Sequence, residues 1–118
     1  MAGPRNTGPQ PMTVLADPGP GGTITATAPH SILPITSAGV EGRTLDPPAQ
    51  EGQRLVIYDQ SHGGQVDITY TPILDASLND TIQLTAARAI IELIAIFHSG
   101  ATKWQAAWKS PEVTLASS

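Results

Sequence analysis

The sequence predicts an all-β protein: a small antiparallel β-barrel or sandwich, β-tulip or jelly-roll-like, with an extended N-terminal arm. From Gly52 onward, short apolar runs alternate with polar or glycine-containing turns at short intervals. Residues 1–22 instead mix proline with glycine, a combination that neither a helix nor a sheet interior tolerates. We therefore expect an arm over residues 1–22 and a β-domain over residues 23–118.

The composition indicates one domain with few surface charges. A chain of 118 residues forms a single domain with a small core. Charged residues make up 14% of it, against roughly 25% in ordinary soluble domains. The net charge is −4 and the six Lys and Arg residues are scattered, which argues against a nucleic-acid partner. A surface with so few charges is typical of one that another protein covers.

Several residue patterns are missing from the sequence. There is no cysteine, which excludes disulfides and thiolate chemistry. Met1–Gln10 lacks the basic start and apolar run of a signal peptide. The longest apolar run, Ala89–Phe97, is interrupted by Glu92 and is far shorter than the ~20 residues that a membrane span needs. We expect no membrane partner.

The N-terminal arm is poor in residues that could hold it in place. Val14 and Leu15 are its only strong apolar anchors. The arm should be extended, and either another chain holds it or it docks on its own domain. The residues expected to contact a partner are Pro4, Arg5, Pro9, Pro11, Val14 and Leu15.

The first part of the β-domain predicts two strands and a connector. Thr23–Ala28 reads as a strand, and so does Ser31–Thr36. Pro34 lies inside the second run and cannot donate to a sheet ladder, so this strand is an edge strand or a bulged one. Gly39–Gln50, with its glycines and prolines, reads as a connector.

The next two runs predict a hairpin. Gly52–Asp59 places Leu55 and Ile57 on one face, and Gln65–Thr71 alternates in the same way, with Val66, Ile68 and Tyr70 facing together. Between them, Gly63 and Gly64 could take the positive φ of a tight turn.

The segment Ala86–Ser99, after a short strand at Thr81–Thr85, could form a helix or a strand. Alanines at its start favour a helix, and Gly100 could end it. An amphipathic helix needs a polar face, however, and between Ile90 and Phe97 only Glu92 is polar. The β-branched residues of this run favour a strand.

The last strands carry both tryptophans. Lys103–Lys109 reads as a strand with Trp104, Ala106 and Trp108 on one face, and Val113–Leu115 follows it. Two tryptophans on one face could form a stacking platform for a sugar or a base. More often such residues anchor a core or an interface.

The order of these elements resembles a known group of proteins. The quoted features are Gly52–Asp59, the Gln65–Thr71 hairpin, the strand at Asp80–Leu84, the run Ile91–Ile96 with Lys103-Trp104 after it, and Val113–Leu115. Over about Thr23 to Leu115 the pattern is similar to head decoration (cement) proteins of tailed bacteriophages and to trimeric phage fibre domains. These features are a packing signature and not a chemical one.

The resemblance implies a homotrimer, an arm that contacts the capsid or a neighbouring subunit, and no catalysis. The long proline-rich arm departs from the fibre pattern and favours decoration of a shell. In such a trimer, we expect the interface and the packing to involve Glu92, Ile94, Ile96, Trp104 and Trp108.

No residue pattern indicates a catalytic, metal or cofactor site. His30, His62 and His98 are far apart in the sequence, and His62 should be solvated in its turn. Glu92 lies in the most apolar run, so its charge needs a partner, such as Arg54 or Arg88, or an interface. We expect a protein that is not an enzyme and needs no cofactor.

The sequence therefore predicts a structural virion protein on the capsid exterior, assembled in the host cytoplasm, that binds the major capsid protein as a homotrimer. The alternative is a carbohydrate- or receptor-binding module of a phage fibre or tail.

Overall fold

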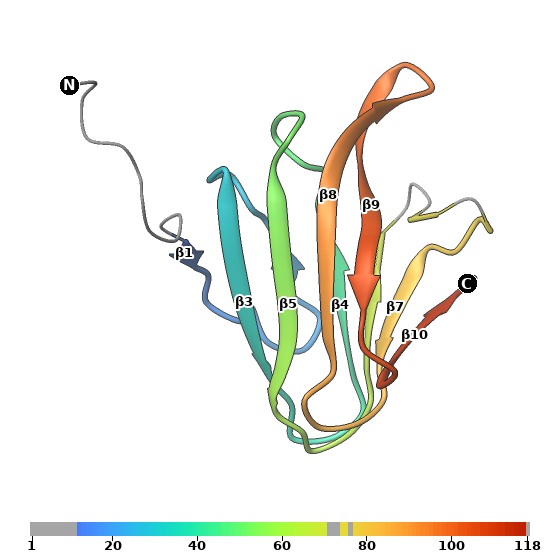
Figure 1. Ribbon diagram of the computed structural model, residues 1–118. Coiled ribbons are helices and arrows are strands. Elements are labelled where there is room, and N and C mark those ends of the chain that lie inside the picture. Colours follow the sequence, from blue (N-terminus) through green and yellow to red (C-terminus); the bar gives the residue numbers. More distant parts are fainter. Residues whose placement is uncertain (1–11, 71–73, 76, 118) are drawn as a thin grey trace.

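The computed structural model describes residues 12–70, 74–75 and 77–117, which form two facing five-stranded sheets without a helix (Figure 1). We call them sheet A and sheet B. The order of sheet A is β1 (Thr13–Val14), β3 (His30–Thr36), β5 (Arg54–Ser61), β8 (Ile90–His98), β9 (Ala101–Lys109). The order of sheet B is β10 (Val113–Ala116), β7 (Thr81–Leu84), β6 (Val66–Thr69), β4 (Glu41–Leu45), β2 (Thr23–Ile24). The all-β prediction is confirmed, as a sandwich and not a closed barrel.

The sheets are mixed, so the predicted antiparallel topology is wrong. The first six strands alternate between the sheets, and each strand in one sheet is followed by a strand of the other. As a result β1, β3 and β5 run parallel, and so do β2, β4 and β6. The remaining pairs are antiparallel. Side chains alternate with a period of two in both kinds of sheet, so the sequence pattern does not reveal the direction of the partner strand.

The predicted hairpin between β5 and β6 is also wrong, because these strands lie in different sheets. Gly63 and Gly64 do not have the positive φ expected of them. They are needed for close approach instead. A Cβ added at Gly63 would collide with the carbonyl oxygen of Ser37, and one added at Gly64 would collide with the backbone of Gly39.

We expect Gly64→Ala to lower the free energy of unfolding by about 1–3 kcal/mol, because the backbone of the 37–40 loop must move to admit the methyl group. Gly39→Ala, in the facing loop, is the matched control, since a Cβ there meets nothing within 4 Å. Urea unfolding of the two variants checks this. Equal midpoints would contradict the close packing at Gly64.

The core lies between the two sheets and follows the predicted alternation. Leu55 and Ile57 point inward on β5, and Val66 and Ile68 do so on β6. Residues 90–98 form a strand, as expected, so the helix alternative is wrong. The other buried apolar residues on strands are Ile24, Leu33, Ile35, Leu45, Ile82, Leu84, Ile91, Leu93, Ala95, Trp104 and Val113.

Of the two alternatives for the strand that contains Pro34, β3 is the bulged strand and not the edge strand, because β1 and β5 flank it. The Leu15 backbone N–H donates to the Ile32 carbonyl oxygen at 2.9 Å, so the polar atoms of Ile32 face β1. The nitrogen of Pro34, two residues later, lies at the same edge beyond the end of β1. The register with β5 also shifts between Ile35 and Thr36.

The described part of the N-terminal arm, from Met12 onward, lies against its own domain. Thr13 and Val14 pair with Ser31 and Ile32, and Leu15 packs against the core. Of the two alternatives for the arm, docking on its own domain therefore applies to these residues. The predicted contact residues Pro4, Arg5, Pro9 and Pro11 lie outside the described residues.

Candidate interaction surface

The outer faces of the two sheets differ in chemistry. On sheet B, the strands present polar side chains outward, in positions that alternate with the buried ones. Such a face is typical of a sheet in contact with water. These residues are Thr44, Asp67, Thr69, Gln83 and Thr114.

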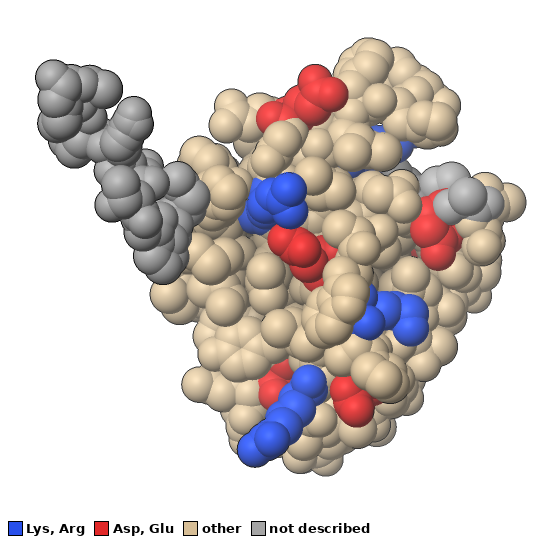
Figure 2. Space-filling model, viewed as in Figure 1, with Lys and Arg blue, Asp and Glu red and all other residues tan. Residues whose placement is uncertain are grey.

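The outer face of sheet A is mostly apolar, and we call it the outer A face. Figure 2 shows mainly uncharged atoms over the centre of this sheet, where one positive and one negative side chain lie side by side. Its residues are half-buried or exposed: Val14, Ile32, Pro34, Arg54, Val56, Tyr58, Ile90, Glu92, Ile94, Ile96, Lys103, Gln105 and Trp108. A continuous apolar face of this kind marks an interaction site more often than an isolated exposed side chain does.

One row of paired residues crosses all five strands of the outer A face. Val14 is paired with Ile32, Ile32 with Val56, Val56 with Glu92, and Glu92 with Trp108. The two ends of the row are the most open, with Val14 68% exposed and Trp108 56% exposed. A partner could therefore bury the largest apolar area at the two edges of this face.

The single acidic group on the outer A face is paired within the face. The Arg54 Nη1 atom lies 3.0 Å from the Glu92 Oε2 atom, on the neighbouring strand. Of the two expected partners of Glu92, Arg54 is therefore the one that binds it. Arg88 is exposed, and its backbone N–H donates to the Asp59 carbonyl. Because the Glu92 charge has its own partner, covering this face would not leave that carboxylate unpaired.

The two tryptophans do not lie on one face as predicted, so the alternative of a stacking platform loses its basis. Leu93 pairs with Ala106, but Glu92 pairs with Trp108, which leaves Ala107 as an extra residue in β9. This bulge reverses the alternation. Trp104 points into the core and is 1% exposed, whereas Trp108 lies on the outer A face beside Glu92.

Two hydrogen bonds hold Trp104 in the core. Its indole N–H donates to the Asp46 carbonyl oxygen at 2.9 Å, and its backbone N–H donates to the Tyr70 hydroxyl at 3.0 Å. Burial raises the pKa of Tyr70, although the bond from Trp104 acts in the opposite direction. Trp104 therefore ties the edge of sheet A to segments that follow β4 and β6.

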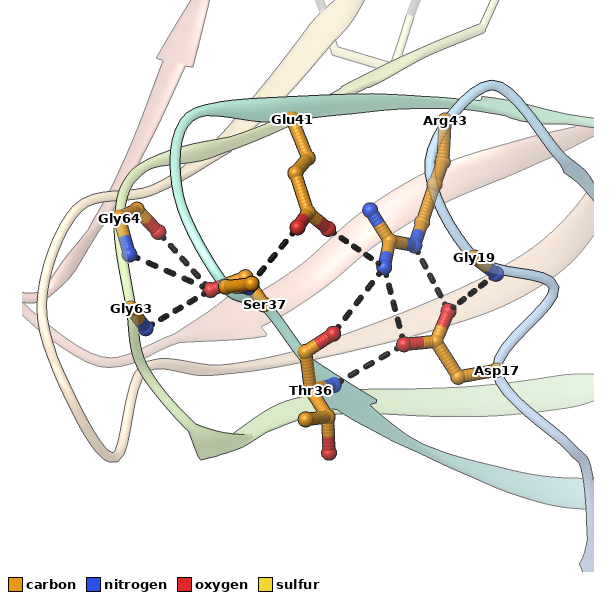
Figure 3. A network of polar contacts seen from close by, with 9 residues as sticks. Asp17, Gly19, Thr36, Ser37, Glu41, Arg43, Gly63 and Gly64 are labelled. Carbon is orange, nitrogen blue, oxygen red and sulfur yellow. Dashed lines mark hydrogen bonds and ion pairs between the residues drawn. The ribbon is translucent and has the colours of Figure 1, made fainter.

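A buried arginine fastens the N-terminal segment to the sandwich (Figure 3). Arg43 occupies an inward position of β4, where its side chain is fully buried. Its Nε and Nη2 atoms bind the two carboxylate oxygens of Asp17 at 2.7 and 2.9 Å. The Nη2 atom also donates to Glu41 Oε1 at 3.1 Å and to the Thr36 carbonyl at 3.2 Å. We call Asp17, Glu41 and Arg43 the arginine cluster.

Both carboxylates of the arginine cluster have lowered pKa values. Burial alone would raise the pKa of Asp17, but hydrogen bonds from Arg43, Thr36 and Gly19 together lower it below the ordinary value. The backbone N–H of Ala38 is the main cause of the lowered pKa of Glu41, and Arg43 adds to it. The pKa of Arg43 is raised, chiefly by its bond to Asp17. All three groups are therefore charged at neutral pH.

Sequence reasoning missed the arginine cluster. It assigned residues 39–50 to a connector, because Gly42 and two adjacent prolines hide the strand β4. The usable signal is the alternation of Arg43 and Leu45, in which arginine occupies an inward position that needs a buried partner.

His62 is not the solvated residue that the sequence predicts. Its side chain is 20% exposed, and its Nδ1 atom contacts the Oδ2 atom of Asp59, whose side chain is fully buried. Asp59 lies in β5, and His62 directly follows that strand. His30 begins β3 and His98 ends β8, so the three histidines lie on different segments of sheet A. Within the described residues, no three His, Cys, Asp or Glu side chains form a group that could hold a metal ion.

No family model matches this chain, and no curated protein does. In the part of the chain that the structure describes, no helix is long and apolar enough to cross a membrane.

The structure brings most of the predicted interface residues together. Glu92, Ile94, Ile96 and Trp108 all lie on the outer A face, and Val14 of the predicted arm joins them there. Trp104 and Leu15 instead point toward the core.

Proposed function

We propose that this protein acts by assembly with other polypeptides, through the outer A face. The supporting observation is the difference between the two outer faces: sheet B presents threonine and other polar residues, and sheet A presents isoleucine, valine and tryptophan. In an isolated monomer both outer faces contact water, so an apolar outer face on one sheet has no stabilising role. In a subunit that buries one face against a partner and exposes the other, the difference between the faces is expected.

The chemistry of the outer A face suits a protein partner. Its apolar residues would contribute ~25 cal/mol for each Å² removed from water, without directional bonds. The Arg54–Glu92 pair is already formed across two strands, so docking need not desolvate an isolated charge. Trp108 is the kind of large, open side chain that often contributes most to binding.

The specific assembly that we propose is a homotrimer that decorates the outside of a bacteriophage capsid and stabilises it by binding the major capsid protein. The resemblance of the sequence pattern to head decoration proteins of tailed bacteriophages supports this choice. The separation of Trp104 from Trp108 removes the stacking platform that favoured a carbohydrate-binding module.

The test is the effect of Ile94→Lys on assembly. Ile94 lies near the middle of the outer A face, so a lysine there would place an unpaired charge in the contact. We expect the parent protein to sediment as a trimer in analytical ultracentrifugation and the variant to sediment as a folded monomer. Thr69→Lys, on the outer face of sheet B, is the control and should leave the trimer intact.

A parent protein that stays monomeric at high concentration, or an Ile94→Lys variant that still forms trimers, would contradict self-assembly through this face.

Co-sedimentation with empty tailed-phage heads that lack their own decoration protein tests whether the protein binds the major capsid protein. We expect the parent to bind and to raise the melting temperature of the heads. Binding to glycans, with the heads ignored, would support a receptor-binding module instead.

A further inference from the structure

A pocket of about 400 Å³ lies where the β8–β9 hairpin meets the loop that follows β6. Figure 1 shows this hairpin extending beyond the other strands at one end of the sandwich. Its two-residue tip, Ser99 and Gly100, has positive φ at both positions, as a tight hairpin turn requires. Ile96 and Lys103 line the pocket from the hairpin, and Leu78 lines it from the loop.

The pocket contains two basic side chains without a partner among the described residues. Lys103 and His98 both line it, and neither side chain forms a hydrogen bond or an ion pair with any described residue. The acidic residue of the lining, Asp75, already has hydrogen-bond partners. Its carboxylate accepts hydrogen bonds from the backbone N–H groups of Ser77 and Asn79 and from the Asn79 side-chain amide, at 3.0 to 3.1 Å. Those bonds outweigh burial and lower the pKa of Asp75. The side chains free to bind a ligand are therefore an ammonium group and an imidazole ring, both of which can donate to an anion.

The wall of the pocket is apolar and partly strained. Leu78 is 62% exposed and has a φ of 64°, a backbone conformation that is unfavourable for a residue with a side chain. A glycine would adopt it freely. Ile96 and Trp104 also belong to the apolar part of the lining, and Gln105 is a further lining residue.

We infer that this pocket binds a small organic anion: a carboxylate that carries a short apolar chain. The Lys103 ammonium and the His98 ring meet the carboxylate, and Leu78 and Ile96 contact the chain. An inorganic anion fits less well, because the pocket lining has one lysine and no arginine, and most of the lining surface is apolar. The pocket shares Ile96, Lys103 and Gln105 with one end of the outer A face, so the titration uses a concentration at which the protein is monomeric.

The test is a titration of the full chain with hexanoate, followed by nitrogen–proton NMR at the Trp104 indole. The spectrum of Trp108→Phe assigns that signal. Hexanol supplies the chain without the charge, and inorganic phosphate supplies a charge without the chain. We expect saturable shifts with hexanoate and weaker effects with the other two. No saturation with hexanoate, or equal binding of hexanol or phosphate, would overturn the inference.

Two variants locate the site. Lys103→Gln should weaken hexanoate binding about tenfold, because one charge-assisted bond is lost. Lys109→Gln is the control: the Lys109 Nζ atom donates to the Val113 carbonyl at 3.0 Å, at the other end of β9. Its effect should stay within about twofold. Leu78→Gly should weaken binding without lowering stability, which separates the site from the fold. Equal affinities for Lys103→Gln and Lys109→Gln would overturn the assignment.

Discussion

Replacing Trp104 with alanine is expected to lower the free energy of unfolding by about 3–5 kcal/mol, the range for a large aromatic side chain removed from a core. Trp104 is the largest fully buried side chain. The substitution leaves a cavity between the sheets and removes the bond from the indole to the Asp46 carbonyl. That carbonyl oxygen then loses this hydrogen bond.

Trp108→Ala is the matched control for Trp104→Ala, because the sequence pattern alone treats the two residues alike. Trp108 lies on the outer A face and is 56% exposed. We expect its removal to cost the isolated subunit less than about 1 kcal/mol. Urea unfolding at a concentration where the protein is monomeric compares the two. Similar losses of unfolding free energy in the two variants would contradict the bulge in β9, which places the two side chains on opposite faces.

Replacing Arg43 with methionine is expected to cost about 3–5 kcal/mol at neutral pH, because the Asp17 carboxylate would keep its charge and lose its buried partner. The Arg43 Nη1 atom is buried without a partner among the described residues, and methionine removes that unpaired donor. This relief favours the lower end of the range. Arg54→Met, which breaks a partly exposed pair, is the control and should cost less than about 1 kcal/mol.

The same cluster predicts the acid sensitivity of the parent protein. Asp17 and Glu41 have lowered pKa values in the folded state, so they bind fewer protons there than in the unfolded chain. Their contribution to stability is complete above the ordinary carboxyl pKa, about 4, and is lost as the pH falls through the lower folded-state values. Unfolding measured at neutral pH and in this acid range should show a smaller pH dependence for Arg43→Met than for the parent. Equal dependence would contradict the role of the cluster.

Local pattern was sufficient to predict most strands and their faces. The alternation around Leu55 and Ile57 identified the inward side of β5 correctly. The shortage of polar residues between Ile90 and Phe97 correctly favoured a strand over a helix. These features depend on which side chains can be buried on a pleated surface, and that information lies in a few neighbouring residues.

Pattern failed where a result depended on residues far apart in the chain. The bulge at Ala107 changes the face of Trp108, yet nothing in Lys103–Lys109 marks it. Arg43 reads as an ordinary surface residue until Asp17, 26 positions earlier, is placed beside it. Gly63 and Gly64 suggest a hairpin turn, although the backbone that they approach belongs to the 37–40 loop.

The sequence by itself determined that this chain is a β-protein with a small core, a sparsely charged surface and a strand at residues 90–98. Only the tertiary structure decided the order and direction of the strands, the position of Asp17 beside Arg43, and the gathering of the apolar residues on the outer A face. The reason is physical. Alternation of side chains is set within one strand, whereas the partner of a strand is chosen by the packing of the whole sandwich.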